Sequence, residues 1–473
     1  MRTFVGRSAE LGMLDRLLAR TSEDTDRPGR SVLVRGRRRV GKSRLVEEFV
    51  DRAAVPSFFF TAAGGPPTTD LADFTAELKA SDLPDASTAT PAEPPTTWTS
   101  AFQMLAAALP TDRASVVVLD EMPYLVRADP TFEGALQRAF DRQFSRLPVL
   151  LILVGSDLAT MEQINTYGRP FYQRATEMVV PPLNPADVAS LLALQPADAI
   201  DAYLVTGGLP LLLDTWPSDA DLWAYLTDSL TDPTSPLIVS GERSLAAELP
   251  TEAQARTVLR AVGHGERTFT TIGRASGLPQ ASLQRALELL TDRRIVAADT
   301  PLSTRPSKET RYRVDDPYLR FWLHFVRPGL PLIERGRGDQ VLARVRDGWT
   351  SWRGRAVEPV IREALWRLAG SGPFPDASAV GGYWTRTNDP EIDLVGTDRE
   401  GVAQALTFVG SVKWLEHHAF DHRDLARLHQ HRERLPGATE ETPLVAVSRS
   451  GVDVAGVTAV GPADLLEAWT ASV

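Results

Sequence analysis

The sequence contains no cysteine, which excludes disulfide bonds and thiolate metal sites. No apolar run approaches the roughly 18 residues of a membrane-spanning helix, and the start of the chain lacks the hydrophobic core of a secretion signal. An excess of positive charge is also lacking, because the formal net charge at pH 7 is −10. These absences predict a cytoplasmic protein that has no membrane partner. The negative net charge also excludes a protein whose whole surface binds nucleic acid, because such binding needs many cations that neutralise phosphates. It allows one locally basic module.

The most informative stretch runs from Ser31 to Phe49. An apolar, β-branched run ends before Gly36, and Gly41-Lys42-Ser43 then opens a helical pattern. This is the G-x-x-x-x-G-K-[ST] phosphate-binding loop between a strand and a helix, which is the context that its mechanism requires. Its backbone N–H groups attract phosphate, its lysine reaches the β- and γ-phosphates of ATP, and its hydroxyl takes one coordination position of Mg²⁺. The predicted nucleotide-binding residues of the loop are Gly36, Arg37, Arg38, Arg39, Val40, Gly41, Lys42, Ser43 and Arg44.

Two later apolar runs also end in polar residues. Asp120 and Glu121 follow the run 115–119, and Ser156 follows the run 148–154. Such runs suit parallel strands buried on both faces, and ligands bind at the carboxyl ends of these strands. We therefore expect Asp120 to hold Mg²⁺ and Glu121 to polarise the attacking water. Ser156 is either a sensor of the γ-phosphate or water, or an N-cap of the next helix.

Two segments between the expected strands are interpreted as surface loops. Residues 63–96 are rich in Pro, Thr, Ala and Asp, with a weak helix signal around Leu71 to Leu78, and are expected to form a surface excursion. Arg169 and Arg174 fall in a loop before a strand at 178–180. Either arginine is a candidate for stabilising the transition state, within the chain or across a subunit interface. Surface solvation is the alternative for both.

Beyond residue 183 the pattern becomes helical. Gly207-Gly208 ends one helix and Pro210 begins the next, which is typical of a small helical lid over a nucleotide or of a plain helical spacer. Three helices and a hairpin then follow, over residues 250–330, and predict a winged helix-turn-helix. This segment is only mildly basic, so DNA binding and protein contact both stay open.

The last segment has the layout of a restriction-endonuclease-like domain. A helix carries Glu358, one expected strand carries Asp393 and the next carries Lys413. In that layout two acids bind Mg²⁺ and the lysine stabilises the attacking water or the scissile phosphate. The usual motif has an acid two residues before the lysine, but Ser411 stands there. We therefore expect a fold that persists with its chemistry lost, although Glu391, one pleat from Asp393 on the same face, is a candidate replacement.

Taken together, these motifs resemble the archaeal-type ATPase family, in the signal-transduction branch of the AAA-like P-loop NTPases. The resemblance is carried by residues 36–43, 119–125, 154–156 and 207–210, and the segment 312–322 with the tail after it resembles the DUF234 region that follows such ATPases. It implies binding and hydrolysis of ATP. Members of this family are regarded as ATP-dependent regulators or defence components, mostly without an assigned substrate, so the resemblance does not identify a biological role. Two further nucleotide contacts are expected by this resemblance: Arg7, in a Gly-Arg-x-x-Glu-Leu element beside the adenine, and Pro210 of the lid.

The predicted architecture is α/β: a P-loop NTPase core with a parallel sheet (1–183), a helical lid (184–249), a winged helix (250–330) and a restriction-endonuclease-like α/β domain (340–473). The leading functional hypothesis is a switch that hydrolyses ATP with Mg²⁺ and couples the nucleotide to the winged helix and tail. One alternative is a DNA-binding or DNA-cleaving protein regulated by ATP. The other is an ATP-bound signalling scaffold with little hydrolysis. The candidate partners are DNA, through the winged helix, or a protein, including a second copy of the chain.

Overall fold

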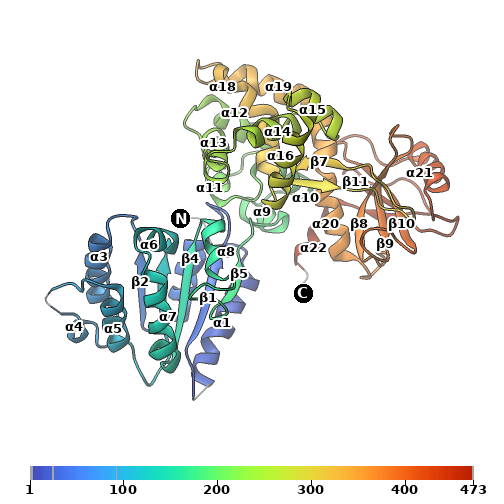
Figure 1. Ribbon diagram of the computed structural model, residues 1–473. Helices are drawn as coiled ribbons and strands as arrows, with labels where there is room; N and C mark the ends of the chain where they lie inside the picture. The colour runs from blue at the N-terminus through green and yellow to red at the C-terminus, as the bar shows by residue number, and fades with distance from the viewer. Residues whose placement is uncertain (1–3, 24–25, 92, 471–473) are drawn as a thin grey trace. The chain divides into compact units, whose positions relative to one another are not determined.

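The computed structural model describes residues 4–23, 26–91 and 93–470. Residues 1–3, part of the segment in which no signal core is expected, lie outside the described residues. The chain forms two compact units, Met1–Leu183 and Asn184–Val473 (Figure 1). The first unit has one parallel sheet, and the second has a mixed sheet and a two-stranded sheet.

A five-stranded parallel sheet forms the centre of the first unit. The strand order is β2-β3-β4-β1-β5, and the residues of β3 and β4 are buried throughout, as expected for strands covered on both faces. Because β4 lies between β1 and β3, the carboxyl ends of these three strands lie side by side, with Arg35 paired with Gly155 and Leu119 with Leu153. The strands are β1 (Arg30–Arg35), β2 (Ser57–Thr61), β3 (Ser115–Asp120), β4 (Val149–Gly155) and β5 (Thr176–Val179).

Helices flank this sheet in the first unit (Figure 1). One of them, α3 (Pro67–Ala80), corrects the expectation that residues 63–96 form a surface excursion. Leu71, Phe74 and Leu78 are buried, and the ring of Phe74 packs edge-on against that of Phe58, with 4.9 Å between centroids. The polar composition of the segment masked a helical apolar spacing. The other helices are α1 (Ser8–Glu23), α2 (Lys42–Ala53), α4 (Ala86–Ala89), α5 (Trp98–Ala108), α6 (Met122–Ala128), α7 (Phe132–Arg142) and α8 (Leu158–Ile164).

The second unit begins with helices and contains a small three-helix module with a two-stranded sheet. The first helices are α9 (Pro185–Leu192), α10 (Pro196–Thr206), α11 (Pro210–Asp214), α12 (Leu222–Thr231) and α13 (Pro236–Glu248). The module consists of α14 (Ala253–Gly263), α15 (Phe269–Ser276), α16 (Gln280–Asp292) and the antiparallel strands β6 (Val296–Asp299) and β7 (Arg311–Val314).

A mixed sheet of order β12-β11-β10-β9-β8 lies in the C-terminal part of this unit. The pairs β8–β9 and β9–β10 are antiparallel, whereas β10–β11 and β11–β12 are parallel. The strands are β8 (Ala379–Trp384), β9 (Glu391–Thr397), β10 (Leu406–Lys413), β11 (Leu444–Ser448) and β12 (Thr458–Val460). The helices are α17 (Pro317–Phe321), α18 (Arg327–Ile333), α19 (Gly338–Ala356), α20 (Glu358–Leu368), α21 (His422–Arg434) and α22 (Pro462–Thr470), with a π-helical segment at Trp322–Val326.

The helices that follow the first unit share a hydrophobic core with this sheet. Ala186 of α9 and Ile200 and Leu204 of α10 belong to the same buried cluster as Ile361 of α20 and Leu394 of β9. The predicted separate lid over 184–249 is therefore wrong for α9 and α10. The sequence shows which helical positions are apolar, but it does not show which surface they cover.

No single helix within the described ranges is long and apolar enough to cross a membrane. The pair α9 and α10 reaches the required length and composition, but it is bent by 109°. Apolar side chains of both helices lie in the core described above, so burial inside the unit explains their composition.

Residues 180–184 connect β5 to α9. The backbone N–H of Val180 donates to the carbonyl of Arg35, at 2.8 Å, which ties the start of the connection to the end of β1. Asn184 and Asp187 form a capping box at the start of α9, which fixes the direction in which the helix begins. Pro181 and Pro182 lie between these two anchored ends.

Candidate functional site

The loop between β1 and α2 depends on glycine at two positions. Gly41 has φ 88°, in the left-handed region that glycine adopts without steric cost. A Cβ on Gly36 would lie 2.5 Å from the carbonyl oxygen of Val180, so the chain after β5 and this loop approach too closely for any side chain. The loop therefore turns sharply from the end of β1 into the first turn of α2.

Lys42 is folded over this loop. Its Nζ donates to the carbonyl oxygens of Gly36, at 2.9 Å, and Arg37, at 3.0 Å, and the residue is 4% exposed. Burial lowers the pKa of Lys42 to about 8, although the charges of Glu121 and Asp120 act in the opposite direction. A buried ammonium group whose hydrogen bonds go to carbonyl oxygens is well suited to bind a phosphate, which adds direct charge-assisted hydrogen bonds to the longer-range attraction of the two carboxylates.

Four side chains form a hydrogen-bonded set across the carboxyl ends of β3 and β4 and the start of α2. The Ser43 hydroxyl donates to Asp120 Oδ2 at 2.7 Å, and the Ser156 hydroxyl donates to Glu121 Oε1 at 3.2 Å. Between them, the backbone N–H of Glu121 donates to Asp120 Oδ1 at 2.7 Å. The insertion of β4 between β1 and β3 explains why residues far apart in the sequence meet here.

The backbone at Glu121 is strained. Its φ of 53° and ψ of 37° lie in the left-handed region, which costs a non-glycine residue about 1–3 kcal/mol and is concentrated at functional sites. This conformation ends β3, starts α6 and leaves the carboxylate within reach of Ser156. The strain is a reason to regard Glu121 as functional rather than as an ordinary turn residue.

Ser43 and Asp120 are suitable ligands for Mg²⁺. A hydroxyl and a carboxylate are the hard oxygen donors that this ion prefers, and the two oxygens are already 2.7 Å apart. Mg²⁺ usually retains waters and binds substrate phosphates beside one or two protein ligands, so a larger acidic cluster is not needed.

The three predicted arginines have different surroundings. Arg7 Nη2 donates to the carbonyl of Val40 at 2.8 Å, so this guanidinium braces the phosphate-binding loop. Arg169 pairs with Glu133 of α7, and its predicted role stays a prediction. Arg174 forms a two-pronged pair with Asp141, at 2.8 and 2.9 Å.

The prediction that Arg174 stabilises the transition state within its own chain is wrong. Thr176 pairs with Val32 in the parallel register of β5 and β1, so Arg174 precedes the amino end of β5. The phosphate-binding loop follows the carboxyl end of β1, and it therefore lies at the opposite end of the parallel strands from Arg174. The sequence shows that Arg174 precedes a strand, but it does not show in which direction this strand runs relative to β1.

In the second unit, the predicted nuclease residues have partners other than one another. The Glu358 carboxylate accepts from Arg362, at 2.8 Å, and Asp393 Oδ2 accepts from the hydroxyl of Ser411, at 3.0 Å. Lys413 Nζ donates to Asp424 of α21 at 2.9 Å. Within the described part of the chain, no group of three or more His, Asp or Glu side chains is arranged to hold a metal ion. Glu358, Asp393 and Lys413 thus each have a side-chain partner outside this set of three, and the expectation that the nuclease chemistry is lost stays a prediction.

Sequence reasoning missed two features. The first is Val180, whose carbonyl confines Gly36; a backbone contact of this kind leaves no trace in residue type. The second is the pairing of Glu391 with Arg311, at 2.6 Å, and with Arg267, at 3.7 Å. Glu391 had been considered only as a metal ligand. Pro210 begins α11 in the second unit, and its predicted contact with nucleotide stays a prediction.

A parallel sheet with a phosphate-binding loop after β1, and an acidic pair at the end of β3, defines a P-loop ATPase core. Residues 3–152 match the family described as AAA ATPase domain, and residues 322–425 match DUF234, described as archaeal and bacterial proteins of unknown function. The chain thus combines an AAA ATPase domain, which binds and hydrolyses ATP, with a C-terminal DUF234 region.

Three other proteins show similarity to this chain. An uncharacterised protein of Methanocaldococcus jannaschii, MJECL04, is 23% identical over 418 residues, which cover 87% of each chain. The Walker-type ATPase PABY2304 of Pyrococcus abyssi is 19% identical, with a TM-score of 0.46 over 68% of this chain and 96% of that one. The ORC2 protein of Aeropyrum pernix, solved with ADPNP and ADP, is 15% identical, with a TM-score of 0.43 over 72% and 95%.

Proposed function

We propose that this protein is a nucleotide-dependent switch, in which the first unit hydrolyses ATP with Mg²⁺ and the second unit responds to the nucleotide. The observation that carries the proposal is the hydrogen-bonded set of Ser43, Asp120, Glu121 and Ser156 beside the ammonium group of Lys42. In this proposal Lys42 is the cation that binds phosphate, and Ser43 and Asp120 are the metal ligands. Glu121 is the carboxylate that polarises water, and Ser156 contacts this carboxylate.

Each residue has one role in this mechanism. Lys42 exchanges its bonds to the loop carbonyls for bonds to phosphate oxygens. Ser43 and Asp120 would hold Mg²⁺, which when bound would neutralise charge on the phosphate oxygens. Glu121 orients and polarises the attacking water as a base. Ser156, which already donates to Glu121, keeps that carboxylate aimed at the water.

The second unit is suited to respond as one body. Its first two helices, α9 and α10, share a core with α20, α22 and the mixed sheet. Any change at the start of α9 is therefore applied to the core of the C-terminal region and not to an isolated lid. This packing supports coupling between the nucleotide and the DUF234 region.

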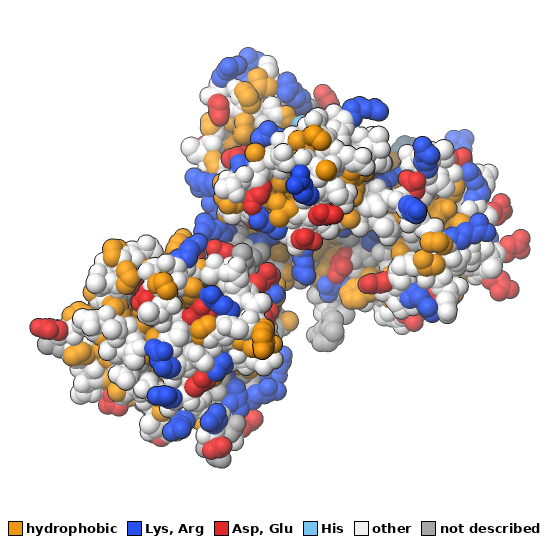
Figure 2. Space-filling model, in the orientation of Figure 1, with side chains coloured by type: hydrophobic (Ala, Val, Ile, Leu, Met, Phe, Trp, Pro, Cys, Tyr) orange, Lys and Arg blue, Asp and Glu red, His pale blue; other side chains and the backbone are white. Residues whose placement is uncertain are grey.

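We further propose that α14–α16 with β6 and β7 form a winged helix that contacts a protein. The third helix, α16, exposes Gln280, Gln284, Arg285, Glu288 and Asp292, so one positive charge stands against two negative charges. On the face shown in Figure 2, Lys and Arg side chains are interspersed with Asp and Glu side chains over both units. Phosphate-backbone binding requires concentrated positive charge, and protein contact does not.

The proposed ATPase site is tested by Lys42→Ala and Asp120→Asn, with Arg52→Ala as the control. Arg52 lies in the last turn of the same helix as Lys42 and pairs with Glu48. Loss of phosphate or metal contacts is expected to reduce turnover by about 100-fold or more, and the control is expected to keep wild-type turnover. Wild-type turnover in Lys42→Ala would refute the assignment. A single-turnover assay with bound ATP distinguishes a slow hydrolase from a scaffold that does not hydrolyse.

A further inference from the structure

A cavity whose lining is rich in arginine lies entirely within the second unit. It has a volume of 390 Å³, which falls in the range of about 300–1,000 Å³ that is typical of small-molecule sites. Its walls come from the end of α14, from β7, from the last turns of α19, from the start of α20 and from Trp384 at the end of β8. None of these elements takes part in the proposed ATPase site.

The lining of this cavity is dominated by arginine. It includes six arginines against the three carboxylates of Glu266, Asp299 and Glu358, an excess of three positive charges. Trp352 and Trp384 add apolar walls. The six arginines are Arg267, Arg311, Arg313, Arg320, Arg355 and Arg362.

Three of the arginines have structural partners. Arg313 pairs with Asp299, at 2.9 Å, and with Asp315, at 2.7 Å. Arg362 pairs with Glu358 at 2.8 Å. Arg320 donates to the backbone carbonyls of Val314 and Ala356. Each of these guanidinium groups joins neighbouring elements of the unit.

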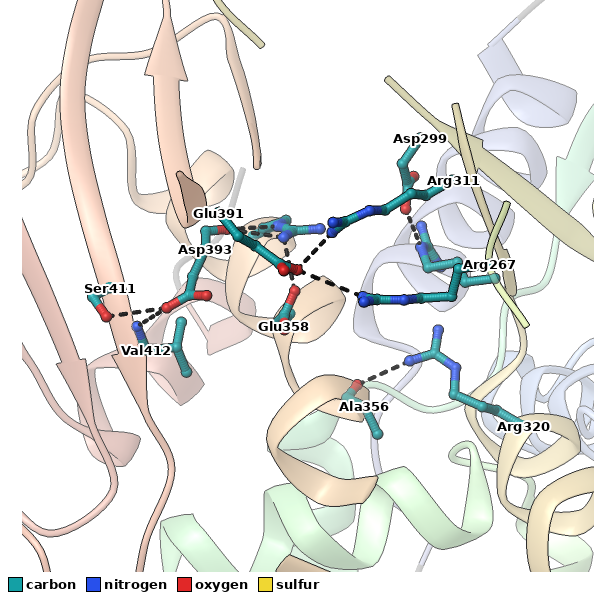
Figure 3. Close-up of polar contacts among 12 residues, drawn as sticks. Arg267, Asp299, Arg311, Arg320, Ala356, Glu358, Glu391, Asp393, Ser411 and Val412 are labelled. Carbon is teal, nitrogen blue, oxygen red and sulfur yellow. Dashed lines mark hydrogen bonds and ion pairs between the residues drawn. The ribbon is translucent and has the colours of Figure 1, made fainter. Parts of the chain in front are cut away.

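Of the other three arginines, Arg267 and Arg311 pair with the same carboxylate, and Arg311 also donates to Asn388 Oδ1 at 2.7 Å. Figure 3 shows the Glu391 side chain reaching toward both Arg267 and Arg311, with separations of 3.7 and 2.6 Å. Arg355 is exposed and, among the residues that the structure describes, forms no ion pair or hydrogen bond with another side chain. Burial, with the nearby positive charges of Arg311 and Arg355, lowers the pKa of Arg267. Three cations around one carboxylate leave a net positive charge that an anion would neutralise.

We propose that this cavity binds a small phosphate-bearing ligand, through Arg267, Arg311 and Arg355. Guanidinium groups match phosphate with paired hydrogen bonds, and several of them together suit a dianion better than a monocarboxylate. The enclosing walls favour a free small molecule over a nucleic-acid duplex, whose backbone runs along its outer surface. The site stands independently of the ATPase proposal, because no residue of the phosphate-binding loop contributes to it.

The test measures binding of pyrophosphate by calorimetry to the full-length protein carrying Lys42→Ala, which removes the main phosphate-binding cation of the ATPase site. Arg355→Ala is added to this background, with Arg344→Ala as the matched control. Arg344 lies on the same helix, is also exposed and does not line the cavity. Arg355 makes no side-chain pair that its removal would break, so the melting temperature of both variants should stay unchanged.

The expected result is that Arg355→Ala weakens pyrophosphate binding about tenfold or more, whereas Arg344→Ala leaves the affinity unaltered. AMP should compete with pyrophosphate for the same site. Equal affinity in the two variants, or no binding at millimolar pyrophosphate, would overturn the proposal. A DNA duplex without terminal phosphates that binds in an Arg355-dependent way, while pyrophosphate and AMP do not, would also overturn it and would indicate a nucleic-acid surface.

Discussion

Arg353 and Asp201 form an ion pair in the interior of the second unit, with 2.8 Å between Nη1 and Oδ2 and side chains that are 1% and 5% exposed. Arg353 lies on α19 and Asp201 on α10, so the pair joins the helices after the ATPase core to the C-terminal region. Glu416 pairs with Arg353 at 2.6 Å, and Trp414 Nε1 donates to the other oxygen of Asp201 at 3.1 Å. Burial raises the pKa of Asp201, against the opposing effect of Arg353.

Removing one partner should therefore destabilise the second unit. Arg353→Met leaves Asp201 buried with less compensation, which is expected to cost about 3–5 kcal/mol of unfolding free energy. The control is Arg367→Met, because Arg367 pairs with Glu363 on the surface, where such a pair contributes about 0–1 kcal/mol. Thermal unfolding followed by circular dichroism measures both. Equal melting temperatures for the two variants would contradict the role of the buried pair.

Glu121→Gln should separate ATP binding from hydrolysis. The substitution preserves the shape of the side chain but removes the carboxylate that would polarise water, so hydrolysis is expected to fall by about 10²–10⁴-fold. Affinity for a fluorescent ATP analogue should change little, because Lys42 and Ser43 remain. Ser156→Ala should slow hydrolysis less, since it removes one hydrogen bond to Glu121. A Glu121→Gln protein that hydrolyses ATP normally would remove this residue from the mechanism.

Gly36→Ala should damage the phosphate-binding loop by steric contact. The new Cβ would lie 2.5 Å from the Val180 carbonyl oxygen, and relief of such overpacking typically costs about 1–3 kcal/mol. Both the melting temperature and the ATP affinity should fall. Gly12→Ala, in the middle of α1 with only the flexible end of Arg16 near its Cβ, is the control and should stabilise the protein slightly. A Gly36→Ala protein with wild-type ATP affinity would show that the loop tolerates displacement.

Asp70 of α3 should make the stability of the first unit depend on pH. It is 1% exposed, and burial raises its pKa, against the opposing effect of a hydrogen bond from the backbone of Ala63. The folded state therefore binds its proton more tightly than the unfolded state, so stability is lost as pH rises from about 4 through the raised pKa. Asp70→Asn should remove this loss and stabilise the protein at pH 8.

Glu77→Gln is the matched control for this prediction, because Glu77 is exposed on the same helix and is not one of the charges that act on the pKa of Asp70. Melting temperatures measured from about pH 3, below the ordinary carboxyl pKa of about 4, up to about pH 8 should converge for wild type and Asp70→Asn at the acidic end, and separate at the alkaline end. A constant difference across that range would show that the carboxylate of Asp70 does not titrate as expected.

The ATPase fold was predictable from the sequence because its signals are local. The run before Gly36, the Gly41-Lys42-Ser43 motif and the buried strand before Asp120 each identify an element and its chemistry without knowledge of the rest. The parallel α/β fold and the pairing with a DUF234 region are confirmed. The winged helix, the cytoplasmic location and the catalytic roles stay predictions.

The errors concern long-range packing. The spacing of Leu71, Phe74 and Leu78 was visible but was outweighed by the polar residues around it. The end of the strands at which Arg174 lies depends on how β5 pairs with β1. The surface that α10 covers depends on residues such as Ile361, more than 150 positions later. Local residue patterns carry no information on either.

The five residues from Val180 to Asn184 have a mechanical consequence. Val180 touches the first glycine of the phosphate-binding loop and is bonded to Arg35, while Asn184 anchors a helix rooted in the core of the second unit. Pro181 and Pro182 fix the φ angles of two residues between these points, so the chain between the two anchored ends has two fewer free backbone torsions than other residues would give it.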